Sequence, residues 1–347
     1  MDFQSQEPLA EVLNHYELKV LRIKNETYKD KKGVWWVETD QGLKILKKIS
    51  NSEQTLKYII SAINHLADNG INLPKIIKTS SGGDYVNKSD TCYVLSEAIE
   101  GKSPSYDSDK ELTMIIRGLA KFHCASKGFK VLNDTKPKIH LGTWIADYTE
   151  QVEDMKFFYE REGSLQETNL IGKFIIEEFP YFYKRAKEAI DSLAGEEYKT
   201  WVETALKEGT LCHQDFAAGN LVLHPSGKLY VLDTDSITVD IPARDLRKIL
   251  CKVMKRTGKW DAVLTKKILE AYHAQNPLTP DQWKVVRIDL LFPHLFLGAM
   301  NKYYYSRDKE WTEDKYFKRI KEMAAFEKTV TPIIDNFNSL IPKDNQQ

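Results

Sequence analysis

The sequence predicts an α+β fold with two lobes, a small antiparallel-sheet lobe that carries one main helix and a large, mostly helical lobe. Two observations predict it. Up to about residue 100, short strand-like apolar runs are separated by turn signals, with one longer helical stretch among them. Beyond residue 101, apolar residues recur mainly at helical spacing, interrupted by one hairpin pattern. The predicted domains are therefore residues 1–100 and 101–347.

The first lobe is predicted to have the order β-β-β-α-β-β after a short helix over 9–16. The expected strands are Leu18–Ile23, Gly33–Glu38, Leu43–Ile49, Lys75–Thr79 and Thr91–Ala98. Ser50-Asn-Ser-Glu53 has the pattern of a capping box, which predicts a helix start, and Gly70 ends that helix. This order is typical of the small lobe of a protein-kinase-like fold. Glu97–Gly101 is the expected hinge to the second lobe.

The second lobe is predicted to be a set of helices around a short hairpin. The expected helices lie near 112–123, 143–162, 168–193, 196–208, 244–256, 260–274, 280–305 and 312–338. Apolar runs on both sides of Pro225-Ser-Gly-Lys228 predict the hairpin. If it closes around Ser226-Gly227, Asn220 lies opposite Asp233, with Cβ atoms roughly 4.5–5.5 Å apart. That spacing would let both side chains hold one cation.

Composition narrows the functional classes. Lys+Arg and Asp+Glu are both 50, so no global field attracts nucleic acid or an anionic membrane surface. No run approaches the roughly 18 apolar residues of a membrane span. The four cysteines show no C-x-x-C pair, and the N-terminus lacks a signal-peptide pattern. We therefore expect a protein made in the cytoplasm, with neither nucleic acid nor membrane as a partner.

The chemistry is expected between His213 and Asp235. Asp215 precedes Asn220 by five residues, and an Asp-x4-Asn loop followed by a further Asp is an arrangement used for phosphoryl transfer. In this arrangement Asp215 orients or deprotonates a substrate hydroxyl, while Asn220 and Asp233 hold Mg²⁺ through oxygen. Asp235 would face the same metal if the strand continues, or else cap a loop. His213 is expected to organise the loop by donating to the backbone, as a buried, satisfied histidine would.

Residues of the first lobe are candidates for binding the nucleotide. Lys47 and Ile45 share one face of a predicted strand, so the lysine would meet phosphates while the isoleucine packs against the base. The alternative for Lys47 is a solvated strand lysine. Glu53 could orient Lys47, or serve only the helix cap. Glu97 and Ile99 of the expected hinge complete the nucleotide-binding set.

A resemblance to a known family rests on these motifs. His213-Gln-Asp-Phe-Ala-Ala-Gly-Asn220, with Val231–Asp235, resembles the Brenner-type motif of aminoglycoside phosphotransferases and choline kinases. Gly142-Thr-Trp144 and Arg244-Asp-Leu-Arg247 look more narrowly like the CotS family of bacterial spore coat proteins. The resemblance implies a two-lobed kinase fold, ATP and Mg²⁺ as cofactors, and location in the spore coat. It also implies a small-molecule acceptor and other coat proteins as partners.

The same resemblance implies roles for single residues: the base for Asp215, metal ligation for Asn220 and Asp233, and the nucleotide lysine for Lys47. Two departures from the family pattern stand out. The segment 24–33 contains one glycine, so its backbone amides would cover phosphates less closely than a Gly-rich loop. Three lysines there could compensate by charge: Lys24, Lys29 and Lys31. In the motif, Gln214 and Phe216 replace the commoner Gly and the commoner Leu or Tyr.

Three functions are consistent with these patterns. The first is an ATP- and Mg²⁺-dependent phosphotransferase that acts on a hydroxyl of a small molecule or sugar. The second is a catalytically weak or inactive kinase-fold component of the coat, which the glycine-poor segment favours. The third takes Asp233-Thr-Asp235 as the Asp-x-Asp of a nucleotide-sugar transferase, but it leaves His213, Asp215 and Asn220 unexplained.

Overall fold

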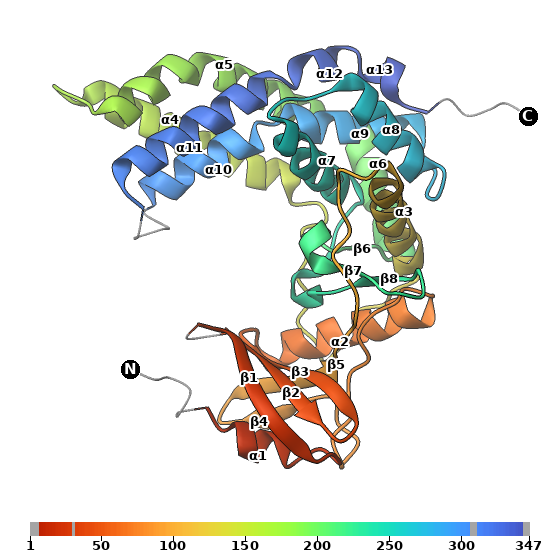
Figure 1. Cartoon of the computed structure of the whole chain (residues 1–347). Coiled ribbons are helices and arrows are strands. Elements are labelled where there is room, and N and C mark those ends of the chain that lie inside the picture. The colour runs from red at the N-terminus through yellow and green to blue at the C-terminus, as the bar shows by residue number, and fades with distance from the viewer. Residues whose placement is uncertain (1–6, 30–31, 306–310, 343–347) are drawn as a thin grey trace, which may run out of the picture. The chain divides into compact units, whose positions relative to one another are not determined.

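The computed structural model describes residues 7–29, 32–305 and 311–342 (Figure 1). The chain forms two compact units. The first comprises Met1–Asp107, Phe129–Lys138 and Ala218–Ile237, and the second comprises Ser108–Gly128, Ile139–Ala217 and Thr238–Gln347. The hairpin that we expected in the second lobe therefore belongs to the first unit. Backbone bridges explain this, because Asn72 pairs with Tyr230 and Lys102 pairs with Leu223.

The first unit is built on a five-stranded antiparallel sheet of order β1-β2-β3-β5-β4. Its elements are α1 (Leu9–Leu13), β1 (Val20–Lys29), β2 (Lys32–Thr39), β3 (Gly42–Ile49), α2 (Glu53–Asp68), β4 (Val86–Lys88) and β5 (Thr91–Glu97). The predicted order is confirmed, but the strand predicted at Lys75–Thr79 is wrong. That segment contributes one bridge, Ile76 to Ser96. The fourth strand is β4, which reaches β5 through Ser89-Asp90, two residues with positive φ that a tight hairpin requires.

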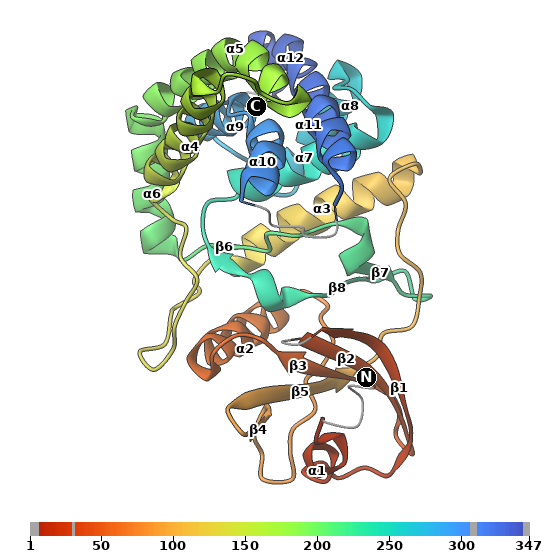
Figure 2. The ribbon, with the colours of Figure 1, turned by 90° about the vertical axis from the view of Figure 1, so that its left-hand side faces the viewer.

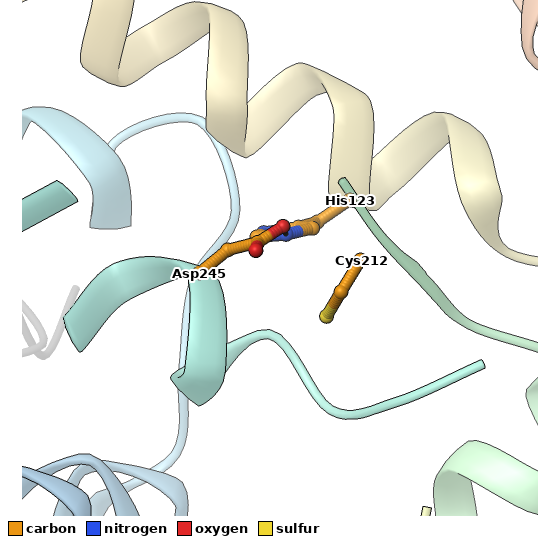
Figure 3. A group of neighbouring side chains, drawn as sticks. All are labelled: His123, Cys212 and Asp245. Atoms are coloured by element: carbon orange, nitrogen blue, oxygen red, sulfur yellow. Dashed lines mark hydrogen bonds and ion pairs between the residues drawn. The ribbon is translucent and has the colours of Figure 1, made fainter. Parts of the chain in front are cut away.

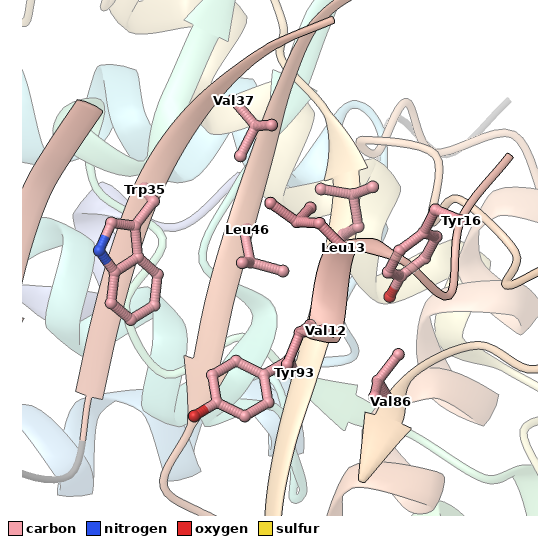
Figure 4. Packing of buried hydrophobic residues seen from close by; sticks show 9 residues of the cluster. Val12, Leu13, Tyr16, Trp35, Val37, Leu46, Val86 and Tyr93 are labelled. Atoms are coloured by element: carbon pink, nitrogen blue, oxygen red, sulfur yellow. The ribbon is translucent and has the colours of Figure 1, made fainter. Parts of the chain in front are cut away.

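One face of this sheet packs into a core with α1. Trp35, Leu46 and Leu95 of the sheet and Val12 of α1 are at most 2% exposed (Figure 4). The indole of Trp35 also fills the space above Gly33, where an added Cβ would lie 2.2 Å from the ring. The one glycine of the segment 24–33 is therefore required by side-chain packing. Of the three lysines in that segment, Lys31 and the side chain of Lys29 lie outside the described residues.

The other face of the sheet carries α2. Ile49 and Cys92 of the sheet pack with Leu56 and Ile60 of the helix. The helix begins later than predicted, because Ser52 is its N-cap and accepts a hydrogen bond from the Thr55 amide at 3.3 Å. The capping box predicted between Ser50 and Glu53 is therefore wrong by two residues, and Glu53 is the first residue of the helix.

The hairpin of the first unit pairs β7 (Leu221–Leu223) with β8 (Leu229–Val231) in a register that differs from the prediction. Leu221 faces Val231, and the Asn220 carbonyl accepts from the Leu232 amide at 2.8 Å. The loop has three residues, Pro225–Gly227, and Gly227 has φ +82°, as hairpins of this length require. The predicted pairing of Asn220 with Asp233 is therefore wrong by one residue.

The second unit is mainly helical. Its helices are α3 (Asp109–Ser126), α4 (Trp144–Ser164), α5 (Leu170–Leu193), α6 (Glu196–Glu208), α7 (Ala243–Thr257), α8 (Ala262–His273), α9 (Pro280–Leu291), α10 (His294–Tyr304), α11 (Glu313–Lys328), α12 (Thr331–Asp335) and α13 (Phe337–Leu340). A two-stranded ladder pairs β6 (Leu211–Cys212) with β9 (Thr238–Val239).

Two predicted helices of this unit are broken in the structure. The predicted helix 280–305 divides into α9 and α10 at Pro293, which cannot continue a helix. The predicted helix 312–338 divides into α11, α12 and α13. Helices α4, α5, α10 and α11 lie side by side (Figure 2). Among the helices in the described part of the chain, none combines the length and apolar character needed to cross a membrane.

Candidate active site

The predicted site residues fall into two groups. Lys47, Ile45, Glu53, Glu97, Ile99, Asn220, Asp233 and Asp235 belong to the first unit, and His213 and Asp215 belong to the second. In the first unit, Lys47 Nζ lies 3.3 Å from Asp233 Oδ1, although 186 residues separate them. The two side chains are 29% and 51% exposed. Such an exposed pair contributes only about 0–1 kcal/mol to stability, so both charges stay available to a ligand.

The direction of the Asp233 side chain is set by its backbone. Asp233 has φ 53° and ψ 55°, a left-handed conformation that few residues other than glycine adopt. Because this conformation ends the strand alternation, the hairpin register no longer decides where the carboxylate points. Its contact with Lys47 does, so the one-residue register error leaves this predicted metal ligand beside the predicted nucleotide lysine.

Asp235 lies in a 3₁₀ helix, Thr234–Ser236, so the expectation of a continuing strand is wrong. Its carbonyl accepts from Lys138 Nζ at 2.7 Å. Burial lowers the pKa of Lys138, and the nearby charge of Asp235 opposes that effect. Asn220 is half-buried and ends the 3₁₀ helix Ala218–Asn220 just before β7.

Lys47 and Ile45 share a face of β3, as expected, since they alternate with buried Leu46. Glu53 has other partners. Its carboxylate accepts from the Tyr85 hydroxyl at 2.7 Å and from the Asn87 amide at 2.8 Å, and these bonds lower its pKa. The ion pair of Lys47 is therefore with Asp233 rather than with Glu53.

The expected hinge begins at the end of β5. Glu97 is the last residue of the strand, and its amide donates to the Lys75 carbonyl at 2.9 Å. Glu97 and Ile99 are both half-buried. Gly101, with φ +145°, passes so close to the hairpin that a Cβ would lie 2.4 Å from the Leu223 carbonyl oxygen. Only glycine allows this approach between hinge and hairpin.

In the second unit, His213 is fully buried directly after β6. Its Nδ1 accepts from the Asp215 amide at 3.2 Å. The ring therefore holds the loop, as predicted, but as an acceptor instead of a donor. The buried carboxylate of Asp245 accepts from the amides of His213 at 2.6 Å and of Gln214 at 2.8 Å. The backbone of residues 213–215 is thus fixed by buried groups.

His123 belongs to the same buried network, and its predicted role as a core histidine is confirmed. The ring accepts from the Tyr272 hydroxyl at 2.6 Å and donates to Asp245 at 3.2 Å. Burial acts to raise the pKa of Asp245, but hydrogen bonding from His123 outweighs it and holds that pKa below its usual value. Cys212 lies close enough for a three-residue metal site (Figure 3). Because its thiol donates to the Ile241 carbonyl at 3.1 Å, all three groups already have protein partners.

Gln214 occupies a left-handed backbone position, φ +71°, where the related motif more often has glycine. Its side chain is held on both ends. The amide nitrogen donates to Thr238 Oγ1 at 2.5 Å, and the amide oxygen accepts from Lys248 Nζ at 2.6 Å. Burial, followed by the charge of Arg247, lowers the pKa of Lys248 to about 8. These contacts offset the cost of a non-glycine residue in this conformation.

The structure adds one charged partner that the sequence did not predict, Lys252, which forms an ion pair with Asp215. Lys252 lies on α7 with Asp245 and Lys248, at positions i, i+3 and i+7 of one helix face. All three contact residues 213–215. Helical spacing from Asp245 would have identified this face, had the partner loop been known.

Two relatives and one family match most or part of the chain. The family described as "Spore coat putative kinase YutH" matches residues 10–337. "Spore coat protein S" of Bacillus subtilis (strain 168) is 30% identical over 335 residues, which cover 96% of this chain and 95% of that protein. "Endospore coat-associated protein YutH" of the same organism is 22% identical over 197 residues, 55% of each chain.

Solved structures show the same fold. An aminoglycoside phosphotransferase from Alicyclobacillus acidocaldarius has a TM-score of 0.80 at 17% identity, with 96% of both chains covered. Spectinomycin phosphotransferase in complex with ADP and spectinomycin has a TM-score of 0.59 at 15% identity, covering 96% of this chain and 98% of that one. The predicted two-lobed kinase-like fold is confirmed. From the family match and the 30% identical relative we conclude that the chain belongs to the kinase-like family of spore coat proteins, as its motifs predicted.

Proposed function

We propose that this protein transfers a phosphoryl group from ATP to a hydroxyl of a small molecule or sugar, with Mg²⁺ as cofactor. The contact between Lys47 and Asp233 carries the proposal. It joins a strand lysine and a post-hairpin carboxylate, the two charges with which phosphoryl transfer holds a nucleotide and its metal. Nucleotide complexes among the fold relatives add support, one with ADP and one with AMP-PNP and Ca²⁺.

The side chains near Asp233 fit a hard divalent cation. Asn220 offers an amide oxygen and Asp233 a half-exposed carboxylate, which are the oxygen donors that Mg²⁺ accepts. We assign these two residues to the metal and Asp235 to its surroundings. When bound, Mg²⁺ would neutralise charge on the phosphates.

The remaining roles follow from side-chain chemistry. The Lys47 ammonium binds phosphate oxygens, and Ile45 with the half-buried hinge residues Glu97 and Ile99 accepts the base. Asp215 orients the acceptor hydroxyl. Because Lys252 occupies one oxygen of the Asp215 carboxylate, the hydroxyl proton is accepted at the other oxygen. His213 holds this loop and takes no proton.

Calorimetric titration with ATP and Mg²⁺ tests the proposal. We expect Mg²⁺-dependent binding that Asp233→Ala abolishes. Asp84→Ala is the matched control, since Asp84 forms an ion pair with Lys78 at 2.5 Å in the same unit and should leave binding intact. Equal binding by wild type and Asp233→Ala would remove the site assignment, and no binding at millimolar ATP would remove the function.

One observation favours the second function, a kinase-fold component of the coat without turnover. Gly33, the one glycine of the segment 24–33, is committed to the Trp35 indole. A folded wild-type protein that binds no nucleotide would leave this function. If ATP binds, screening hydroxylated metabolites for ATP consumption separates a working phosphotransferase from a protein that only binds nucleotide.

A further inference from the structure

A second cavity lies in the helical unit, away from the residues assigned above. It has a volume of about 490 Å³ and is lined by residues of α10 and α11. That volume is typical of small-molecule sites, which span roughly 300–1,000 Å³. The lining side chains that matter are His294, Leu295, Lys302, Trp311, Arg319 and Met323.

The charge of this cavity is positive. Lys302 and Arg319 are cationic, and the described lining includes no carboxylate. The ammonium of Lys302 lies 3.9 Å from the centre of the Trp311 ring, so the indole holds it in place. Arg319 has Glu322 at 4.0 Å, with both side chains more than 40% exposed. An exposed pair at this distance is weak, so an anion can compete for the guanidinium.

His294 adds hydrogen bonding without charge. Its Nε2 donates to Asp289 Oδ1 at 2.7 Å, which orients the ring. Burial, and then the charge of Arg247, lowers the pKa of His294 to about 4, so the ring is neutral at pH 7. The rest of the wall is apolar, with Leu295, Met323 and the Trp311 indole. Two cations beside an aromatic and aliphatic wall suit a molecule with one anionic end and an uncharged body.

We propose that this cavity binds a small organic anion, with its phosphate or carboxylate group at Lys302 and Arg319 and its body against Trp311. The proposal goes beyond phosphoryl transfer and does not depend on it. A physical connection to the candidate loop exists, however. Asp289, the partner of His294, also accepts from Arg247 Nε at 3.2 Å. Arg247 lies two residues from Asp245 on α7, and Asp245 holds the loop at residues 213 and 214.

The test is calorimetry on the full chain, without nucleotide, in a buffer free of phosphate and carboxylate. Three probes share one sugar ring: glucose, glucuronate and glucose 6-phosphate. We expect at least one of the two anions to bind, about tenfold or more tighter than glucose, because charge-assisted hydrogen bonds are roughly twice as strong as neutral ones. Which anion binds more tightly identifies the group. Affinity should also fall as salt is added.

The double variant Lys302→Gln/Arg319→Gln should lose about tenfold or more of that affinity. Lys315→Gln is the matched control, because Lys315 also lies over Trp311, at 4.4 Å, but does not line the cavity. It should bind as wild type does. The proposal is overturned if neither anion binds more tightly than glucose, or if the double variant binds as tightly as Lys315→Gln. Since no ATP is present, either result is independent of whether the protein is a phosphotransferase.

Discussion

Two segments depart from the residues usual in related phosphotransferases, and the structure treats them differently. In the loop 213–215, Gln214 stands at a left-handed position, but buried partners hold its backbone amide and both ends of its side chain. In the segment 24–33, the one glycine serves the packing of Trp35. A departure can therefore be compensated locally or can mark a changed use. The loop keeps the geometry that chemistry needs, whereas the segment has taken a structural role.

The largest effect is expected from removing the support of the loop. Asp245→Ala leaves two backbone amides and His123 without their buried acceptor. We expect a loss of roughly 3–5 kcal/mol in unfolding free energy, the range for breaking a buried polar network. Urea unfolding measures it. Asp191→Ala, which removes an exposed i,i+4 partner of Lys187, should change stability by less than about 0.5 kcal/mol. A loss below 1 kcal/mol for Asp245→Ala would mean that the loop is held elsewhere.

The second prediction concerns the other segment. Gly33→Ala places a Cβ 2.2 Å from the Trp35 indole, so the ring must move in a fully packed core. We expect a loss of about 1–3 kcal/mol in unfolding free energy, as for other overpacked sites. Gly163→Ala is the control, since Gly163 has open space around its Cβ position and lies in α4. If Gly33→Ala instead keeps its stability and loses nucleotide affinity, the segment covers phosphates after all.

Prediction from sequence succeeded where a pattern repeats and failed where single residues decide. The order of the strands, the fold class and the shared face of Ile45 and Lys47 followed from periodicity. The hairpin register did not, because one extra loop residue at Pro225–Gly227 moves every pair by one. The sequence also could not show that Asp233 would reach Lys47, since this depends on one left-handed residue and a contact between distant segments. Lys252 was missed for the same reason, as only the packing of α7 brings it to Asp215.

A third prediction separates strain from bonding at Gln214. Gln214→Ala and Gln214→Gly both remove the contacts to Thr238 and Lys248, so they differ only in the backbone conformation they tolerate. The left-handed position costs a non-glycine residue about 1–2 kcal/mol. We therefore expect Gln214→Ala to be less stable than Gln214→Gly by about that amount in urea unfolding. Equal stability would show that the loop relaxes once its side-chain contacts are gone.

The smallest effect should appear as a pH dependence of the loop's support. Burial lowers the pKa of Lys248 to about 8 in the folded protein, whereas the unfolded chain keeps an ordinary lysine near 10.4. Between these values the unfolded state binds more protons, so stability due to this group rises with pH. Between pH 8 and 9.5 the unfolding free energy of wild type should therefore rise relative to that of Lys248→Gln, which cannot titrate. A difference that stays constant across this range would place Lys248 in water, and the support of Gln214 would then rest on Asp245 and Thr238 alone.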